Sequence, residues 1–338
     1  MGCTLKDVAL AVGVSPATAS LALNNKSGIS EKTREAVIEA AMKLNYSFHT
    51  SGNKSKTFRP ICFIKIAVHG LVVNDDHKGF IADYIDGIEK EARKADYSLE
   101  VRTYNEFNIQ VILNDIYKQA YSGVIILATE LLEQDILKFK GLSIPKIFID
   151  ASYPFHSFDF VNMDNQSALY TVIKKFIEKG ITKIGLIRSK VVTRNFELRS
   201  EFFYEALKYF RLEANPTWDL AVGLTFDEAY NDMLQYLDGG NSVPEGFFCV
   251  CDIMGLGIMR ALKERKIRVP AEVSVVGFDD LPQCQMVDPS LSSVKVSKNL
   301  MGKRAFQYLE KMMSSEKRIA SEKTYIGCEI VQRESLRP

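Results

Sequence analysis

Two different hydrophobic patterns divide the chain. Over the first 46 residues, apolar side chains recur every three or four positions, in three short stretches that each end near turn-forming residues. From residue 60 onward, short apolar runs alternate with longer stretches of helical period. The first pattern predicts three short helices. The second predicts alternating strands and helices, which form parallel sheets with helices on both faces.

The helical segment at the N-terminus has recognisable start and stop signals. Thr4 with Asp7 three residues later resembles a capping box, and Gly13 supplies the left-handed residue that ends a first helix. Pro16 suits the first turn of a second helix, and Ser30 suits the N-cap of a third. Three short helices with a glycine turn between the first two are typical of a helix-turn-helix unit, whose second helix enters the DNA major groove. A small helical cap on a larger domain fits the same pattern.

The remainder of the chain contains two successive series of strand and helix patterns. Strands are expected at 61–68, 98–104, 123–129 and 146–150 with a helix over 80–95, and then at 183–187, 247–251 and 273–278 with helices near 196–210 and 255–266. Two such series predict two similar lobes.

Polar residues stand just after several of these strands, where parallel sheets place their ligands. They are Asp75, Asp76, Asp150, Asp252, Asp279 and Asp280, together with Arg199 near the start of a helix. A group rich in aspartate with one arginine suits a hydroxyl-bearing ligand such as a sugar. The alternative is that an aspartate at a strand end only caps the next helix, above all for Asp76 and Asp252.

Composition and charge narrow the possible classes of protein. A chain of 338 residues with 46% hydrophobic and 25% charged residues is expected to fold into more than one water-soluble domain. Residues 1–59 hold 8 basic and 4 acidic side chains, so the positive excess lies where a nucleic acid would be bound. The sequence has no secretory signal and no apolar segment near ~18 residues, and its six cysteines show no clustered spacing. We therefore expect a cytoplasmic protein without a membrane segment.

The sequence gives no support for catalysis or for a bound cofactor. Phosphate-binding loops and nucleophile elbows are absent, and Asp279 and Asp280 are adjacent rather than converging from separate elements. None of the four histidines has metal-ligand spacing, and Cys249 and Cys251 alternate along a strand as core residues do. We therefore expect no enzyme, no metal and no cofactor. An exported solute receptor is the main alternative, but it would need a signal sequence and has no use for a helix-turn-helix unit.

The run TLKDVALAVGVSPATASLALNNKSGISEKTREAVIEAAMKLNY resembles the DNA-binding headpiece of the lactose repressor family nearly end to end. The resemblance implies a transcriptional regulator, in which phosphate contacts hold the helices in position on double-stranded operator DNA. The DNA-binding residues that it implies are Thr4, Ser15, Thr18, Ser20, Asn24, Arg34 and Tyr46.

Two departures from the family concern how DNA is recognised. The base-reading positions fall on Pro16, Ala17 and Leu21, which are all apolar and offer no bidentate hydrogen bonds. The segment 47–59 is a basic tether without the Ala-rich hinge helix and the Leu wedge that the family usually has. Specificity is therefore expected to depend on thymine methyl groups, on DNA shape or on residues elsewhere.

The resemblance continues through YSGVIIL, IPKIFIDAS, VNMDN, RALKERKIRVPAEVSVVGFDD, DPSLSSV and QRES. It implies an effector domain with the two-lobed α/β fold of type I periplasmic binding proteins, and it places Asp150, Arg199 and Asp279 at effector contacts. Leu224 falls where the family usually has an aromatic residue, Phe226 is an alternative for it, and Cys251 falls where Asn is usual. Asp75 and Phe80 complete the expected effector set.

Taken together, these features predict a homodimeric regulator, most simply a repressor, controlled by a small-molecule effector such as a sugar or a related polar metabolite. The expected domains are a helix-turn-helix unit at 1–46, a linker with a degenerate hinge at 47–59 and an effector and dimerisation domain at 60–338. The two lobes of the last are expected at 60–157 with 292–325, and at 158–291 with 326–338.

Overall fold

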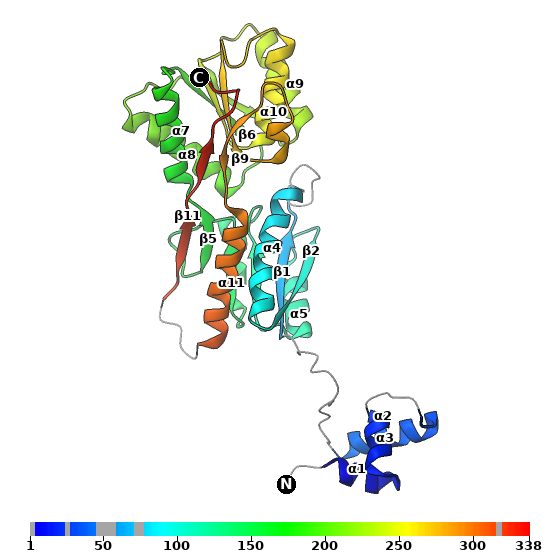
Figure 1. Cartoon of the computed structure of the whole chain (residues 1–338). Coiled ribbons are helices and arrows are strands. Elements are labelled where there is room, and N and C mark those ends of the chain that lie inside the picture. The colour runs from blue at the N-terminus through cyan, green and yellow to red at the C-terminus, as the bar shows by residue number, and fades with distance from the viewer. Residues whose placement is uncertain (1–3, 24–27, 45–58, 71–77, 316–319) are drawn as a thin grey trace. The chain divides into compact units, whose positions relative to one another are not determined.

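The computed structural model describes residues 4–23, 28–44, 59–70, 78–315 and 320–338. The chain separates into two compact units, 1–58 and 59–338 (Figure 1). Asn24, Tyr46, Asp75, Asp76 and nearly all of the linker 47–59 lie outside the described residues, so the expectations for them stay predictions.

The first unit is the expected three-helix unit, with α1 (Leu5–Val12), α2 (Pro16–Leu23) and α3 (Glu31–Lys43). The Asp7 carboxylate accepts hydrogen bonds from the backbone N–H and the hydroxyl of Thr4, both at 2.7 Å, and Gly13 ends α1 with φ 72°. The helices pack around Val8, Ala9, Ala19, Ala22, Leu23, Val37 and Ala41. Leu44, directly after the end of α3, is exposed.

The second unit alternates strands and helices as expected. Its strands are β1 (Arg59–Ile66), β2 (Tyr97–Tyr104), β3 (Val124–Leu127), β4 (Lys146–Ile149), β5 (Phe160–Met163), β6 (Ile184–Ser189), β7 (Asp219–Val222), β8 (Gly246–Cys249), β9 (Ser274–Asp279), β10 (Ser292–Lys295), β11 (Lys323–Ile326) and β12 (Glu329–Val331). Its α-helices are α4 (Lys78–Lys94), α5 (Ile109–Gln119), α6 (Glu133–Lys138), α7 (Asn165–Glu178), α8 (Arg194–Tyr209), α9 (Phe226–Asp238), α10 (Asp252–Glu264) and α11 (Lys298–Ser314). Short 3-10 helices cover Phe139–Gly141, Pro216–Trp218 and Pro282–Gln285.

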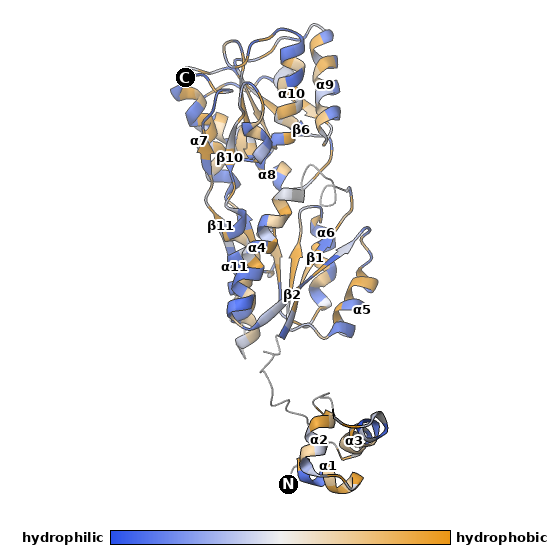
Figure 2. Ribbon diagram, turned by 45° about the vertical axis from the view of Figure 1, so that its right-hand side comes forward, coloured by the Kyte–Doolittle hydropathy of each residue, from blue (hydrophilic) through white to orange (hydrophobic). Residues whose placement is uncertain are grey.

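The strands form two sheets with matching topology. Their orders are β11-β5-β4-β3-β1-β2 and β12-β10-β9-β8-β6-β7, so each strand of one sheet has a counterpart in the other. In the described part of the chain, neighbouring strands pair in parallel, except for β10 with β12. The central strands are strongly hydrophobic, as β1 shows in Figure 2, because helices cover both faces of each sheet. The predicted fold class is confirmed.

The lobe boundaries differ from those expected at two strands. β5 pairs with β4 and β11 in the first sheet, and β10 pairs with β9 and β12 in the second. The chain therefore passes between the lobes after Met163, between Lys295 and Lys298, and between Ile326 and Glu329. The expected boundaries at 157/158 and 291/292 were wrong because a strand next to a crossover has the same hydrophobic pattern in either sheet.

Two glycines bring α4 and α11 unusually close on one face of the first sheet (Figure 1). A Cβ atom on Gly87 would lie 2.2 Å from the carbonyl oxygen of Asn299, and one on Gly302 would lie 2.2 Å from that of Tyr84. Only glycine fits at such a backbone approach. The two helices therefore form a closely packed pair at the edge of the site described next.

Candidate functional site

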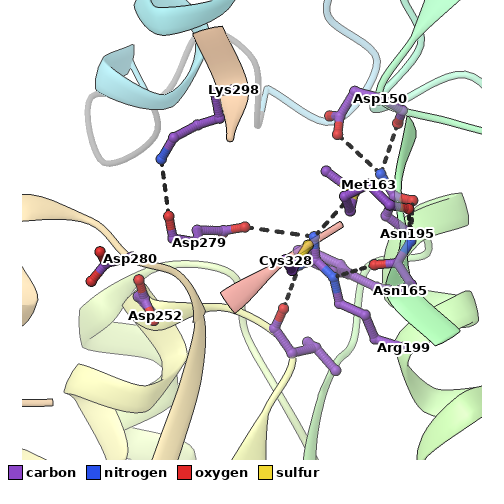
Figure 3. Close-up of polar contacts among 12 residues, drawn as sticks. Asp150, Met163, Asn165, Asn195, Arg199, Asp252, Asp279, Asp280, Lys298 and Cys328 are labelled. Atoms are coloured by element: carbon purple, nitrogen blue, oxygen red, sulfur yellow. Dashed lines mark hydrogen bonds and ion pairs between the residues drawn. The ribbon is translucent and has the colours of Figure 1, made fainter. Parts of the chain in front are cut away.

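Two aspartates stand at equivalent places in the two sheets. Asp150 follows β4, Asp279 ends β9, and β4 and β9 are counterparts in the strand orders. Both side chains are buried, and both residues have left-handed backbone angles, with φ 69° and 113°. Since non-glycine residues pay for such angles, the turn after each strand is held by its surroundings. Figure 3 shows both aspartates in one polar cluster between the lobes.

Asp150 is surrounded by hydrogen-bond donors. The Tyr84 hydroxyl donates to its Oδ1 at 3.1 Å, the Thr129 hydroxyl donates to its Oδ2, and Asn195 Nδ2 lies 3.0 Å from Oδ1. Burial raises the pKa of Asp150 to about 6, although the Thr129 bond and the charge of Arg199 act in the opposite direction. The carboxyl group therefore holds its proton to a higher pH than an exposed aspartate does.

Arg199 lies on α8 and is only 2% exposed. Its Nε donates to Asn165 Oδ1 at 3.1 Å, and its Nη1 donates to the Val250 carbonyl at 2.6 Å. Its Nη2 forms an ion pair with Asp279 Oδ1 at 3.5 Å, and the guanidinium carbon lies 3.7 Å from the centre of the Phe278 ring. The guanidinium is thus fixed on every side, and its charge is balanced by Asp279.

Three asparagines, which the sequence analysis did not single out, connect the lobes. Asn195 of α8 donates to the Asp150 carbonyl at 2.9 Å, and its Oδ1 accepts from Asn162 Nδ2 at 2.8 Å and from Asn165 Nδ2 at 3.0 Å. Asn195 stands one helical turn before Arg199, so both side chains lie on the same face of α8. That four-residue spacing is the sequence signal that points to Asn195.

Glu130, which the sequence patterns also did not indicate, holds the loop after β1. Its Oε2 accepts from the backbone N–H of Val68 at 2.6 Å, of His69, and of Gly70 at 3.1 Å. Three successive amides around one carboxylate form an anion nest. Glu130 therefore fixes the loop that leads toward Asp75.

The other expected effector residues differ in placement. Cys251 and Leu224 are buried at the ends of β8 and β7, and burial raises the pKa of the Cys251 thiol to about 12. The Phe80 ring packs edge-on against Tyr84 at 5.2 Å. Phe226, in contrast, is 36% exposed and lines a groove of about 840 Å³ along α10. The structure therefore does not group Phe226 with the buried cluster.

Asp252 and Asp280 have structural partners. Asp252 accepts from the Ser293 hydroxyl at 2.6 Å and from the Leu281 N–H at 2.8 Å, and burial raises its pKa to about 7. Asp280 accepts from Arg333 Nη2 at 2.6 Å. These bonds tie the turn after β9 to neighbouring segments, which favours a structural role for both carboxylates.

In the first unit, α2 carries the three apolar positions that are expected to read bases. Pro16 and Ala17 are exposed, while Thr18, Ser20 and Leu21 are half-buried. The Ser15 Oγ accepts from the Thr18 N–H at 3.0 Å and lies 2.9 Å from its hydroxyl, which caps the helix.

Arg34 has a contact that the sequence did not predict. Its Nη1 donates to the Ala22 carbonyl near the end of α2 at 3.2 Å. This bond ties α3 to α2.

Comparisons with known proteins agree with this architecture. Residues 4–48 match the family described as bacterial regulatory proteins, lacI family, and residues 173–336 match a periplasmic binding protein-like domain. The transcriptional repressors named PurR of Haemophilus influenzae and Vibrio cholerae are each 28% identical to this chain, over 309 and 314 residues, with 90% of both chains covered.

Solved structures give the same result for the fold. A CelR regulator in complex with cellobiose has a TM-score of 0.73 at 22% identity and covers 98% of this chain and 99% of its own. A lac repressor dimer bound to operator and an anti-inducer has a TM-score of 0.74 at 22% identity, with 99% of both chains covered. No helix in the described ranges is long and apolar enough to cross a membrane.

A helix-turn-helix unit followed by a two-lobed α/β unit with a buried polar cluster defines a DNA-binding regulator with an effector domain. The chain belongs to the lacI family of bacterial regulatory proteins.

Proposed function

We propose that this protein is a homodimeric transcriptional repressor whose affinity for operator DNA is controlled by a small polar effector bound between the lobes. The observation that carries the proposal is the cluster of Asp150, Arg199 and Asp279, which lies between two lobes in the same chain as a helix-turn-helix unit. Relatives named as repressors, and a lac repressor structure described as a dimer on its operator, support it. A regulator of this kind acts in the cytoplasm and is not an enzyme.

The recognition helix is α2. Its exposed Pro16 and Ala17 and its half-buried Leu21 offer methyl and methylene groups to the major groove, which suits contact with thymine methyl groups. Two copies related by a two-fold axis would place their α2 helices roughly 34 to 36 Å apart in successive major grooves. The operator is therefore expected to be a palindrome whose half-sites contain thymine at the contacted positions.

The charges of the cluster favour an uncharged effector. Among its buried side chains in the described part of the chain, the cations are Arg199 and Lys298 and the anions are Asp150 and Asp279. Arg199 is already bonded on every side, and Lys298 is bonded to the Asp279 carbonyl. Because the two cations and two anions already balance, a phosphate ester would add uncompensated negative charge to the cluster. A neutral compound with several hydroxyl, carbonyl or amide groups fits better.

The subunit contact is assigned to the groove along α10. Phe226, Leu256, Met259 and Val287 line its apolar part, and Met286 beside it is 80% exposed. Arg260, Lys263, Lys266 and Arg268 line the rest of the groove. An apolar centre with polar side chains around it is typical of homodimer interfaces. Met286→Glu should give a monomer in size-exclusion chromatography with light scattering, while Phe155→Glu, an exposed control, should remain a dimer.

A thermal-shift screen tests the effector assignment. Neutral sugars and nucleobases are compared with their phosphorylated counterparts, since a ligand that binds only the folded state raises the melting temperature. A shift confined to neutral compounds supports the proposal, whereas a shift confined to phosphate esters contradicts the charge argument. Removal of residues 1–58 should abolish binding to a duplex selected from random sequences and leave the thermal shift intact. Specific DNA binding by the truncated protein would refute the domain assignment.

A further inference from the structure

Lys298 is a buried cation that the sequence analysis did not select. It opens α11 and is 7% exposed, with its Nζ 2.9 Å from the Asp279 carbonyl oxygen and 4.7 Å from the centre of the Phe80 ring. The carboxylate of Asp83, which is about half exposed, lies 3.9 Å away. A buried ammonium is costly, and the N-terminus of a helix is the positive end of its dipole. The contacts with the Asp279 carbonyl, the Phe80 ring and Asp83 offset the free-energy cost of burying this ammonium group.

The bond between Lys298 and Asp279 spans the two lobes (Figure 3). α11 packs against α4 in the first lobe, whereas Asp279 ends β9 in the second. The segment between Lys295 and Lys298 is one of the crossovers, so the bond bridges a hinge of the molecule. A change in the angle between the lobes would stretch it.

The same bond fixes the peptide that carries Asp279. Its carbonyl accepts from Lys298, while the N–H of the same peptide unit, that of Asp280, donates to Ser293 Oγ at 3.0 Å. Asp279 and Asp280 both have left-handed angles, with φ 113° and 52°. Two successive residues in this region are strained, and hydrogen bonds at both ends of the peptide hold the strain in place. The Asp279 carboxylate is thereby directed toward Arg199.

One helix pair therefore holds both aspartates of the cluster. Tyr84 of α4 donates to Asp150 at 3.1 Å, and Lys298 of α11 donates to Asp279. The glycine contacts that press α4 against α11 involve the backbone of Tyr84 itself and of Asn299, the neighbour of Lys298. The two donors thus lie at, or next to, the close backbone contacts between α4 and α11.

We propose that Lys298 is a positioning residue, which links lobe closure to the orientation of the Asp279 carboxylate in the effector site. Its relevance to effector binding rests on the function proposed above. The effect of Lys298 on the turn at Asp279 can be measured without any ligand.

The test is hydrogen–deuterium exchange of the full-length protein without added ligand, followed at residues 279–281. Lys298→Met removes the ammonium and nearly keeps the chain length, while Lys298→Arg keeps the charge. Lys303→Met on the same helix is the control, since Lys303 is partly exposed and pairs with Glu91 at 3.7 Å. We expect exchange about tenfold faster in Lys298→Met, restored to within about threefold in Lys298→Arg and unchanged in Lys303→Met.

Two outcomes would overturn the proposal. One is exchange in Lys298→Met within about twofold of the original protein. The other is acceleration over the whole second lobe in both Lys298 variants alike, which would mean that Lys298 only stabilises the fold. If Lys298→Met does not fold, Lys298→Gln is measured in its place. A screen in which no compound raises the melting temperature would refute the proposed effector and leave this exchange result to decide on Lys298.

Discussion

The ion pair between Arg199 and Asp279 offers a quantitative test of the buried cluster. Their side chains are 3% and 7% exposed, so neither charge has water as an alternative partner. Breaking a buried pair by removing one member costs about 3 to 5 kcal/mol, mostly because the other charge is left behind. In Arg199→Met, the carbonyl of Val250 and the amide oxygen of Asn165 also lose a donor. We expect a loss of about 4 kcal/mol in the free energy of unfolding.

A double-mutant cycle separates the charge from the packing. Asp279→Asn in the Arg199→Met background removes the stranded charge and should recover about 2 kcal/mol, whereas Asp279→Asn alone should destabilise. Urea denaturation is followed by the fluorescence of Trp218, the only tryptophan of the chain. If Arg199→Met costs under about 1 kcal/mol, or if the two substitutions are additive, the ion pair does not hold the cluster and the reasoning fails.

Three further predictions use the same measurements. The folded-state pKa of Asp150 is raised to about 6 from 3.8, so its contribution to stability is complete below about pH 4 and is lost as the pH rises through about 6. Between about pH 4 and pH 8, the original protein should therefore lose about 2 kcal/mol of unfolding free energy relative to Asp150→Asn. The same pH dependence of the unfolding free energy in both proteins would contradict this. Gly302→Ala puts a Cβ atom 2.2 Å from the Tyr84 carbonyl oxygen and should cost about 2 kcal/mol by forcing α4 and α11 apart, which an unchanged denaturation midpoint would exclude. Arg34→Met removes the bond to the Ala22 carbonyl and should destabilise the first unit by about 1 kcal/mol, measured as an earlier loss of helical circular dichroism. DNA binding, measured by fluorescence anisotropy, should weaken, while the thermal shift caused by the effector should remain.

The parts of the molecule that the sequence predicted are those encoded locally. The capping box of Thr4 and Asp7, the left-handed Gly13 and the cap at Ser30 involve residues at most four positions apart, and the structure contains all of them. The alternation of strands and helices is local in the same sense. Helix ends and hydrophobic periods therefore sufficed for the element order and the fold class.

The features that were missed depend on distant parts of the chain. Lys298 gave no signal because it matters only where α11 brings it to Asp279, 19 residues earlier in the chain. The bonds of Asn195 to Asp150 and Asn162 span 45 and 33 residues. A polar residue at the end of a predicted strand is a candidate for binding, and this rule finds the carboxylates. The Asn195 amide and the Lys298 ammonium group that hold these aspartates lie on helices, where polar residues are usually solvent-exposed and give no such signal.

The cations of the cluster also bear on how an effector would be recognised. The family resemblance suggested that an aromatic face for stacking is missing at Leu224, and the structure shows that two other rings are engaged within the protein. Arg199 lies 3.7 Å from the centre of the Phe278 ring, and Lys298 lies 4.7 Å from that of Phe80. A ring covered by the protein's own cation has that face closed to a ligand, since both would bind the same negative π surface. These two ring faces are therefore not open for stacking, and this favours recognition by hydrogen bonds to the ligand's hydroxyl and carbonyl groups.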